Sequence, residues 1–88
     1  MIRRRVVVHG RVQGVFFRDS ARGLAERHGV SGWIANRADG AVEAVLEGAE
    51  EGVARLVQWM REGPRGAQVD DVDVKDEEPE GLRGFSVR

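Results

Sequence analysis

The order of hydrophobic patterns along the chain is the feature that most constrains its fold. Apolar residues recur at helical spacing within residues 17–28 and 50–62. The remaining apolar segments are short, alternating or rich in valine, which predicts strands at 6–10, on both sides of Asp39-Gly40, at 67–77 and near 85–87. Asp-Gly between alternating segments is a strong hairpin signal. The expected order is therefore β-α-β-β-α-β with a short final strand.

This order predicts one α+β domain over residues 1–88, a ferredoxin-like two-layer sandwich. Two helices would cover one face of an antiparallel sheet. The first and second strands would run parallel, joined by a right-handed helical crossover, with the third strand between them. Because their C-terminal ends would lie at one edge of the sheet, we expect the turn after the first strand to lie close to Asn36.

Three local features carry further expectations. The alternation slips at Asp70-Asp71, which indicates a bulge in the fourth strand. The run from Arg3 to Arg5 is interpreted as a solvated strand end. Gly23 lies inside the first helix, which indicates either close packing at that point or a tolerated fault.

The composition limits which kinds of molecule the chain could bind and in which cellular compartment it is expected. The chain has a net charge of −1 and no cysteine, so disulfides and thiolate sites are excluded, and the charge does not favour nucleic acid or an anionic membrane. No apolar run approaches the roughly 20 residues that span a bilayer, and the basic start followed by valines is interpreted as a strand, not as a signal peptide. The absence of cysteine fits a reducing cytoplasm, and the modest size and lack of a spare apolar stripe favour a monomer.

The turn between the first strand and the first helix reads GRVQGV, residues 10–15. Successive backbone N–H groups in such a turn can form an anion cradle, and a helix N-terminus adds unpaired N–H groups. Gly10 and Gly14 permit unusual backbone conformations. Arg18, in the first helical turn, could place a planar cationic fork over the same position. An ordinary connecting turn followed by a surface arginine is the alternative.

Asn36 ends the second strand, just before the predicted hairpin turn. Asparagine favours turns, so a purely local role is one interpretation. Its carboxamide can also donate to and accept from a water molecule. Next to an anion cradle, it could hold a water in line with a bound phosphorus.

No metal site is predicted. His9 and His28 have no third ligand at a usual spacing. The acidic stretch from Asp70 to Glu80 lacks the glycine and the spacing of a calcium loop. Asp19 is expected to pair with a nearby cation.

Two segments of the chain resemble the signature stretches of the acylphosphatase family. The first is VHGRVQGVFFR, and the second is GVSGWIANRADGAVE. Ile34 where valine is usual, and Ala41 where a hydroxyl residue is common, are mild departures. The resemblance covers nearly the whole chain.

The resemblance implies hydrolysis of small acyl phosphates to a carboxylate and inorganic phosphate, with no metal and no other cofactor. Inorganic phosphate would be both product and competitive ligand. Arg18 would bind the phosphate, and Asn36 would orient the attacking water. The backbone N–H groups of the cradle would come from Arg11, Val12, Gln13, Gly14 and Val15.

Three other classes of function are weighed against this one. A phosphate sensor would use the cradle without turnover, but simple anion binding does not need a water-positioning amide. An RNA platform would stack bases on exposed aromatics in basic surroundings, yet no strand shows that pattern and the chain lacks tyrosine. A regulatory or carbamoyl-transfer role is expected where such a domain is attached to others.

Overall fold

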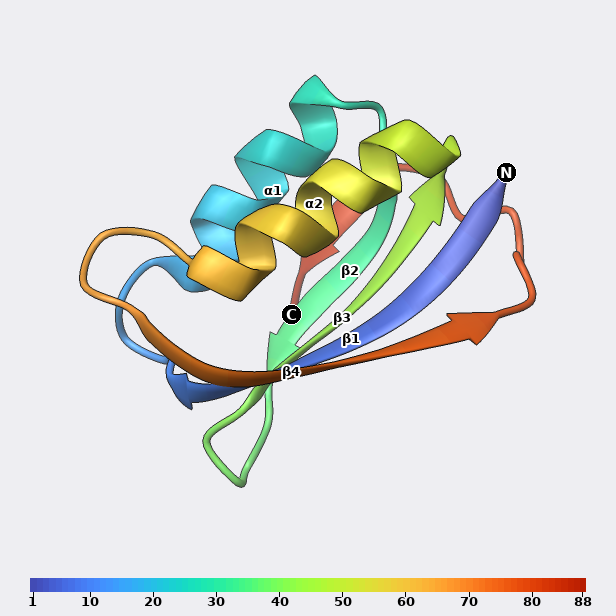
Figure 1. Ribbon diagram of the computed structural model, residues 1–88. Coiled ribbons are helices and arrows are strands. Elements are labelled where there is room, and N and C mark those ends of the chain that lie inside the picture. Colours follow the sequence, from blue (N-terminus) through green and yellow to red (C-terminus); the bar gives the residue numbers. More distant parts are fainter.

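The computed structural model describes residues 1–88, and its elements follow the predicted order (Figure 1). Both helices are too short and too polar to cross a bilayer. The strands are β1 (Ile2–Arg11), β2 (Ser31–Asn36), β3 (Val42–Gly48), β4 (Gln68–Glu77) and β5 (Phe85–Val87), and the helices are α1 (Phe17–Arg27) and α2 (Glu50–Glu62).

The five strands form one sheet in the order β4-β1-β3-β2-β5. β1 and β2 both pair antiparallel with β3, so they run parallel to each other, as predicted. The final strand differs from the predicted antiparallel sheet, because β5 pairs parallel with β2 and makes the sheet mixed. The C-terminal ends of β1, β2 and β5 therefore lie at the same end of the sheet.

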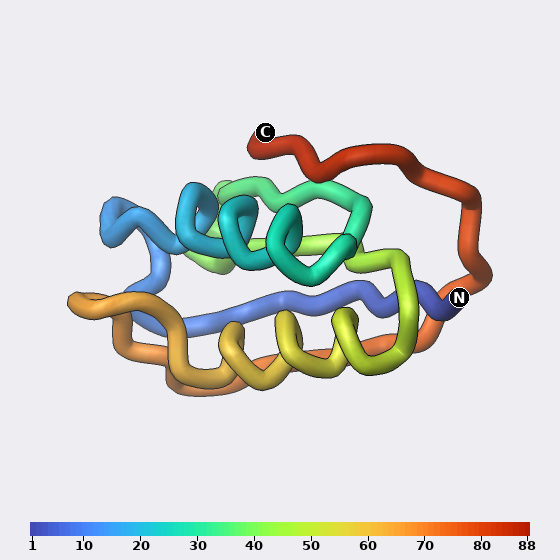
Figure 2. Tube along the Cα trace, turned by 90° about the horizontal axis from the view of Figure 1, so that it is seen from above, coloured from blue at the N-terminus to red at the C-terminus, as the bar shows by residue number.

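Both helices cover the same face of the sheet (Figure 1), α1 on the β2 side and α2 on the β4 side (Figure 2). The core lies between these two layers. The strands contribute alternate residues to it, as a sheet with one covered face requires. The buried core side chains are Val6, Val8, Val12, Phe17, Ala21, Ala25, Val30, Ile34, Val42, Ala44, Leu46, Val53, Leu56 and Met60.

The predicted bulge is present where β4 pairs with the end of β1. His9 lies opposite Asp71, whereas Gly10 lies opposite Val69, so Asp70 has no partner on β1. Gly10 has a φ of 128°, and a Cβ at that position would lie 2.2 Å from the Gln68 oxygen. Only glycine lets the two backbones approach this closely.

The expectation of a solvated strand end is wrong for Arg3. This residue is 5% exposed, and its Nη1 lies 2.8 Å from Oε2 of the fully buried Glu47. Its Nε lies 2.8 Å from Oε1 of Glu77. Arg5, next along this face, is half-buried and pairs with Glu43 and Glu77.

Glu47 also holds the connection between β4 and β5. Its carboxylate accepts hydrogen bonds from the backbone N–H groups of Glu80, Gly81 and Leu82 at 2.8, 3.0 and 3.0 Å. Burial by itself raises the pKa of the Glu47 carboxyl, but these bonds and the one from Arg3 outweigh burial and lower the pKa from 4.5 to about 2. The segment that leads into β5 is thus attached to the middle of the sheet.

Candidate active site

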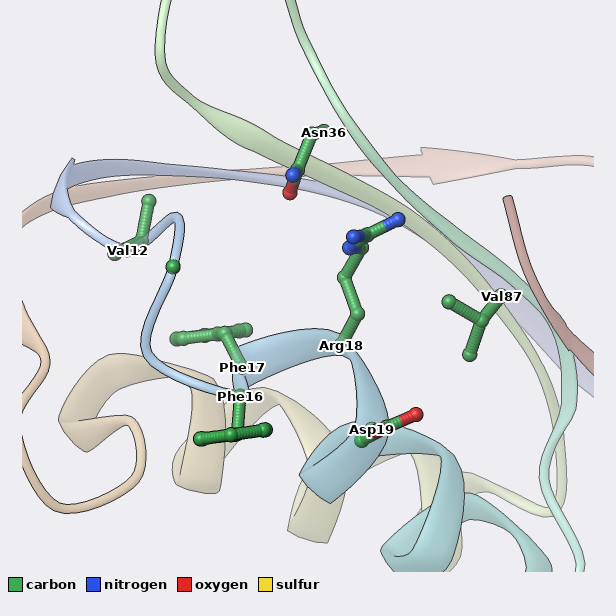
Figure 3. A pocket seen from close by; sticks show the side chains of 8 residues that line it. Val12, Phe16, Phe17, Arg18, Asp19, Asn36 and Val87 are labelled. Atoms are coloured by element: carbon green, nitrogen blue, oxygen red, sulfur yellow. The ribbon is translucent and has the colours of Figure 1, made fainter.

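A solvent-open cavity of about 330 Å³ lies at the edge where β1, β2 and β5 end (Figure 3). Strands β1 and β2 bring the cradle turn and Asn36 to this edge, and β5 adds Val87. The expected proximity of the turn to Asn36 is confirmed. The residues that line the cavity are Val12, Gly14, Phe16, Phe17, Arg18, Asp19, Asn36 and Val87.

The cradle turn has an unusual backbone. Gly14 has a φ of 75° and Phe16 a φ of 61°, and the backbone N–H groups of residues 12–16 donate no hydrogen bond within the protein. Left-handed residues in a turn direct successive N–H groups into an anion-binding concavity. Of the predicted cradle residues, Val12 and Gly14 line the cavity, whereas Gln13 and Val15 do not. Arg11 is the last residue of β1, opposite Gln68.

Helix α1 begins at this cavity without a capping side chain. Phe16 stands at the N-cap position and makes no side-chain hydrogen bond there. The first N–H groups of a helix have no partner within the helix, and they carry the positive end of its dipole. The start of α1 therefore adds further unpaired donors to those of the turn.

Arg18 extends from the first turn of α1 toward Asn36 (Figure 3). Its Nη1 donates to the backbone oxygen of Arg88 at 2.5 Å, and it makes no ion pair with an aspartate or glutamate. Arg88 in turn donates its N–H to the Ile34 oxygen at 2.8 Å. The guanidinium of Arg18 is thus held at the cavity with its other N–H groups free to bind a ligand.

Gln13 has a role that sequence reasoning missed. Its Nε2 donates to the oxygens of Arg37 and Ala41, at 2.8 and 3.0 Å. Both acceptors belong to the connection between β2 and β3, directly after Asn36. The Gln13 side chain therefore ties the cradle turn to the loop that follows Asn36, and it does not line the cavity.

Four cavity residues were also not predicted as part of a site: Phe16, Phe17, Asp19 and Val87. Asp19 pairs with a cation, as expected, since its Oδ1 lies 3.5 Å from Nη2 of Arg22. No sequence signal marks Phe16, because its left-handed conformation is set by the surrounding turn. Val87 enters through the parallel pairing of β5, which was also not predicted.

The histidines lie apart from this cavity. His9 Nε2 lies 3.4 Å from Asp73 Oδ2, and His28 follows the end of α1. No group of three or more histidine, cysteine, aspartate or glutamate side chains is arranged to hold a metal ion.

Comparisons with known proteins agree on one family. The acylphosphatase family model matches residues 4–87. The acylphosphatase of Rubrobacter xylanophilus is 59% identical over 85 residues, which cover 96% of this chain and 77% of that protein. The crystal structure of acylphosphatase from Bacillus subtilis covers 100% of this chain and 99% of its own, with 36% identity and a TM-score of 0.96.

An acylphosphatase structure from Coxiella burnetii is similar as well, with 39% identity and a TM-score of 0.94 over 99% of this chain and 92% of its own. Sequence and fold therefore both match acylphosphatases over nearly the whole chain. The chain belongs to the acylphosphatase family of acyl phosphate hydrolases.

Proposed function

We propose that this chain hydrolyses acyl phosphates in the cavity at the start of α1 by direct attack of water on phosphorus. The phosphate would be bound by the backbone N–H groups of residues 11–15 and by the Arg18 guanidinium. The observation that carries this proposal is the set of N–H groups at residues 12–16 without a protein acceptor, beside a cavity shared by Arg18 and Asn36.

The reaction needs little covalent work from the protein. Water attacks phosphorus, the bond between phosphorus and the acyl oxygen breaks, and the dianionic substrate yields a carboxylate and dihydrogen phosphate. Phosphoryl transfer depends mainly on positioning and on stabilising charge at the phosphoryl oxygens. The carboxylate is a good leaving group, so the scheme requires no strong general acid.

Arg18 and the N–H groups would stabilise charge on the equatorial oxygens of the transition state. The fork of a guanidinium suits two phosphate oxygens, whereas a lysine would supply only a point charge. Asn36 would accept from and donate to the attacking water, which orients it opposite the leaving carboxylate. We propose that the reaction uses neither a metal nor another cofactor.

The test is hydrolysis of benzoyl phosphate in excess chelator. We expect turnover by the wild-type protein, a loss of about 10³-fold in kcat/KM for Arg18→Ala, and a loss of about 10²-fold for Arg18→Lys. Asn36→Ala should lower kcat by about 10²-fold with little change in KM, because water is placed in the transition state. Arg27→Ala, at the exposed far end of α1, is the matched control and should behave as wild type.

Wild-type kcat/KM in both Arg18 variants would refute the proposed mechanism. If the wild type instead bound inorganic phosphate without turnover, and lost that binding in Arg18→Ala, the protein would be a phosphate sensor. Inorganic phosphate is expected to be a competitive inhibitor of the enzyme.

We propose further that the protein is a cytoplasmic monomer. The absence of cysteine suits a reducing compartment, and the apolar faces of both helices pack on the sheet. Sedimentation equilibrium at micromolar concentration should give the mass of one chain, 9.7 kDa. A mass of two chains would contradict this part of the proposal.

A further inference from the structure

We propose that Phe16 and Asp19 form an acyl-selecting end of the cavity, which favours uncharged aromatic acyl groups and disfavours acyl groups that carry a carboxylate. This inference rests on the proposed function, in which the phosphate lies at the end formed by Arg18 and Asn36. It concerns the other end of the same cavity.

The cavity has two chemically different ends (Figure 3). The Arg18 guanidinium and the Asn36 side chain lie at one end, and Phe16 and Asp19 lie at the start of α1 on the other. Because a water molecule occupies about 30 Å³ of liquid, a cavity of about 330 Å³ has room for a phosphate and an acyl group of several atoms. The acyl group of a bound substrate would extend from the phosphate toward Phe16 and Asp19.

Phe16 presents an aromatic ring that the fold does not use. It is 78% exposed and lies outside the hydrophobic core cluster. Its φ of 61° is a conformation that a residue other than glycine adopts only at a cost. A flat apolar surface at the rim of the cavity can cover a benzoyl ring, whereas an acetyl group is too small to gain from it.

Asp19 is the only acidic residue that lines the cavity. It lies in the first turn of α1, three residues after the N-cap residue Phe16, and both residues line the cavity. Its ion pair with Arg22, at 3.5 Å, joins two side chains that are 64% and 47% exposed, and so neutralises the carboxylate only weakly. A second carboxylate on the acyl group would be repelled here, by an amount that salt reduces.

The experiment compares kcat/KM for two matched pairs of substrates. Butyryl phosphate and succinyl phosphate have acyl chains of equal length and differ at the far end, where one carries a methyl group and the other a carboxylate. Benzoyl phosphate and acetyl phosphate differ in the aromatic ring. Each ratio is compared between the wild type and a variant, so the intrinsic reactivities of the substrates cancel.

For Asp19→Asn we expect the butyryl-to-succinyl ratio to fall by about threefold to tenfold at low salt, and the difference from wild type to shrink at high salt. Glu26→Gln removes an equal charge from the exposed C-terminal half of α1, and should leave the ratio unchanged. For both Phe16→Ala and Phe16→Gly we expect the benzoyl-to-acetyl ratio to fall by about threefold to tenfold. Glycine adopts the positive φ of residue 16 without strain, and alanine does not. A fall in the benzoyl-to-acetyl ratio that both variants share is therefore caused by the loss of the ring.

An unchanged butyryl-to-succinyl ratio in Asp19→Asn, or a fall of equal size in Glu26→Gln, would overturn the role of Asp19. An unchanged benzoyl-to-acetyl ratio in both Phe16 variants would overturn the role of the ring. Failure of the proposed function gives a different result, namely wild-type kcat/KM in both Arg18 variants with all four substrates.

Discussion

Arg18 and Arg88 are joined by a hydrogen bond from the Arg18 Nη1 to the Arg88 backbone oxygen, at 2.5 Å. The Arg88 guanidinium points elsewhere, because its Cζ lies 4.4 Å from the centroid of the Trp33 ring. Trp33 and the buried Ile34 are consecutive in β2 and so face opposite sides of the sheet. The Arg18 guanidinium thus lies at the cavity. The Arg88 guanidinium stacks on Trp33 and so holds the end of the chain, after β5, against the face of the sheet that the helices do not cover.

This arrangement makes Trp33 a positioning residue for Arg18. Trp33→Leu removes the surface on which Arg88 stacks, so the Arg88 oxygen should be held less firmly and Arg18 should be less well oriented. We expect the inhibition constant for inorganic phosphate to rise by about threefold to tenfold. The measurement is competitive inhibition of benzoyl phosphate hydrolysis.

A double-mutant cycle separates this role from general destabilisation. Arg88→Ala keeps the backbone oxygen but loses the stacking, so it should have the same effect as Trp33→Leu. If the two act through one contact, the double variant should be no worse than either single variant. Fully additive effects on phosphate inhibition would show that Trp33 does not act through Arg88.

The Gln13 side chain should be needed for activity although it does not line the cavity. Gln13→Ala removes both hydrogen bonds to the β2–β3 connection, and we expect kcat/KM to fall by about tenfold because the cradle and Asn36 lose their fixed relation. Gln13→Glu should be worse, since a carboxylate cannot donate and adds negative charge near the phosphate. Gln58→Ala, an exposed glutamine on α2, is the control. Equal kcat/KM for Gln13→Glu and wild type would contradict the proposal that the Gln13 side chain positions the cradle turn relative to Asn36.

Glu47 should make the protein sensitive to acid over a defined range. Its pKa is about 2 in the folded protein and near 4.5 when unfolded. A carboxyl with a depressed pKa stabilises the fold fully above its unfolded value, and this stability is lost as pH falls through the folded one. The free energy of unfolding should therefore fall by about 3 kcal/mol between pH 5 and pH 2 through this group alone.

The measurement is urea unfolding across that pH range. In Glu47→Gln the pH dependence should be flatter, and the stability at pH 7 should be lower by about 3 kcal/mol or more, because Arg3 is left buried with less compensation. Glu51→Gln, an exposed residue of α2, should keep the wild-type slope. A Glu47→Gln slope equal to that of wild type would refute the assignment.

Two helical glycines should respond to alanine in opposite directions. A Cβ on Gly23 would meet no atom within 4 Å, so Gly23 is a tolerated fault and does not mark close packing. Gly23→Ala should stabilise the protein by about 1 kcal/mol and raise Tm by about 4–8 °C. A Cβ on Gly52 would lie 2.8 Å from the backbone oxygen of His28. Gly52→Ala should therefore lower Tm, and a rise in Tm for both variants would contradict this reading of the packing.

The layered fold was predictable because its signals are local and periodic. The stripe of Val53, Leu56, Val57 and Met60 and the alternation of Val42, Ala44 and Leu46 each identify one element and its buried face. Six of these seven residues are buried, and Val57 is partly buried. Connection rules then determine which strands run parallel, so the proximity of Asn36 to the cradle turn follows from topology. The roles of Arg18 and Asn36 remain predictions.

What could not be predicted depends on contacts between distant segments. Arg3 reads as a solvated residue because its burial requires Glu47 and Glu77, which lie 44 and 74 residues away. The pairing of β5 with β2 has no signal in three residues. The left-handed conformation of Phe16 and the tether from Gln13 likewise arise only when the turn, the hairpin connection and α1 are assembled.

The bond between Arg18 and Arg88 also closes a loop of 70 residues. Contacts of such high sequence separation are expected to form late in folding. The chain must first lose the conformational entropy of closing the loop, and only then does the contact stabilise it. Hydrolysis regained during refolding should therefore lag behind the return of helical signal and report the docking of β5. Enzymatic turnover then becomes a stricter kinetic probe of the native topology than any spectroscopic measure of its helices.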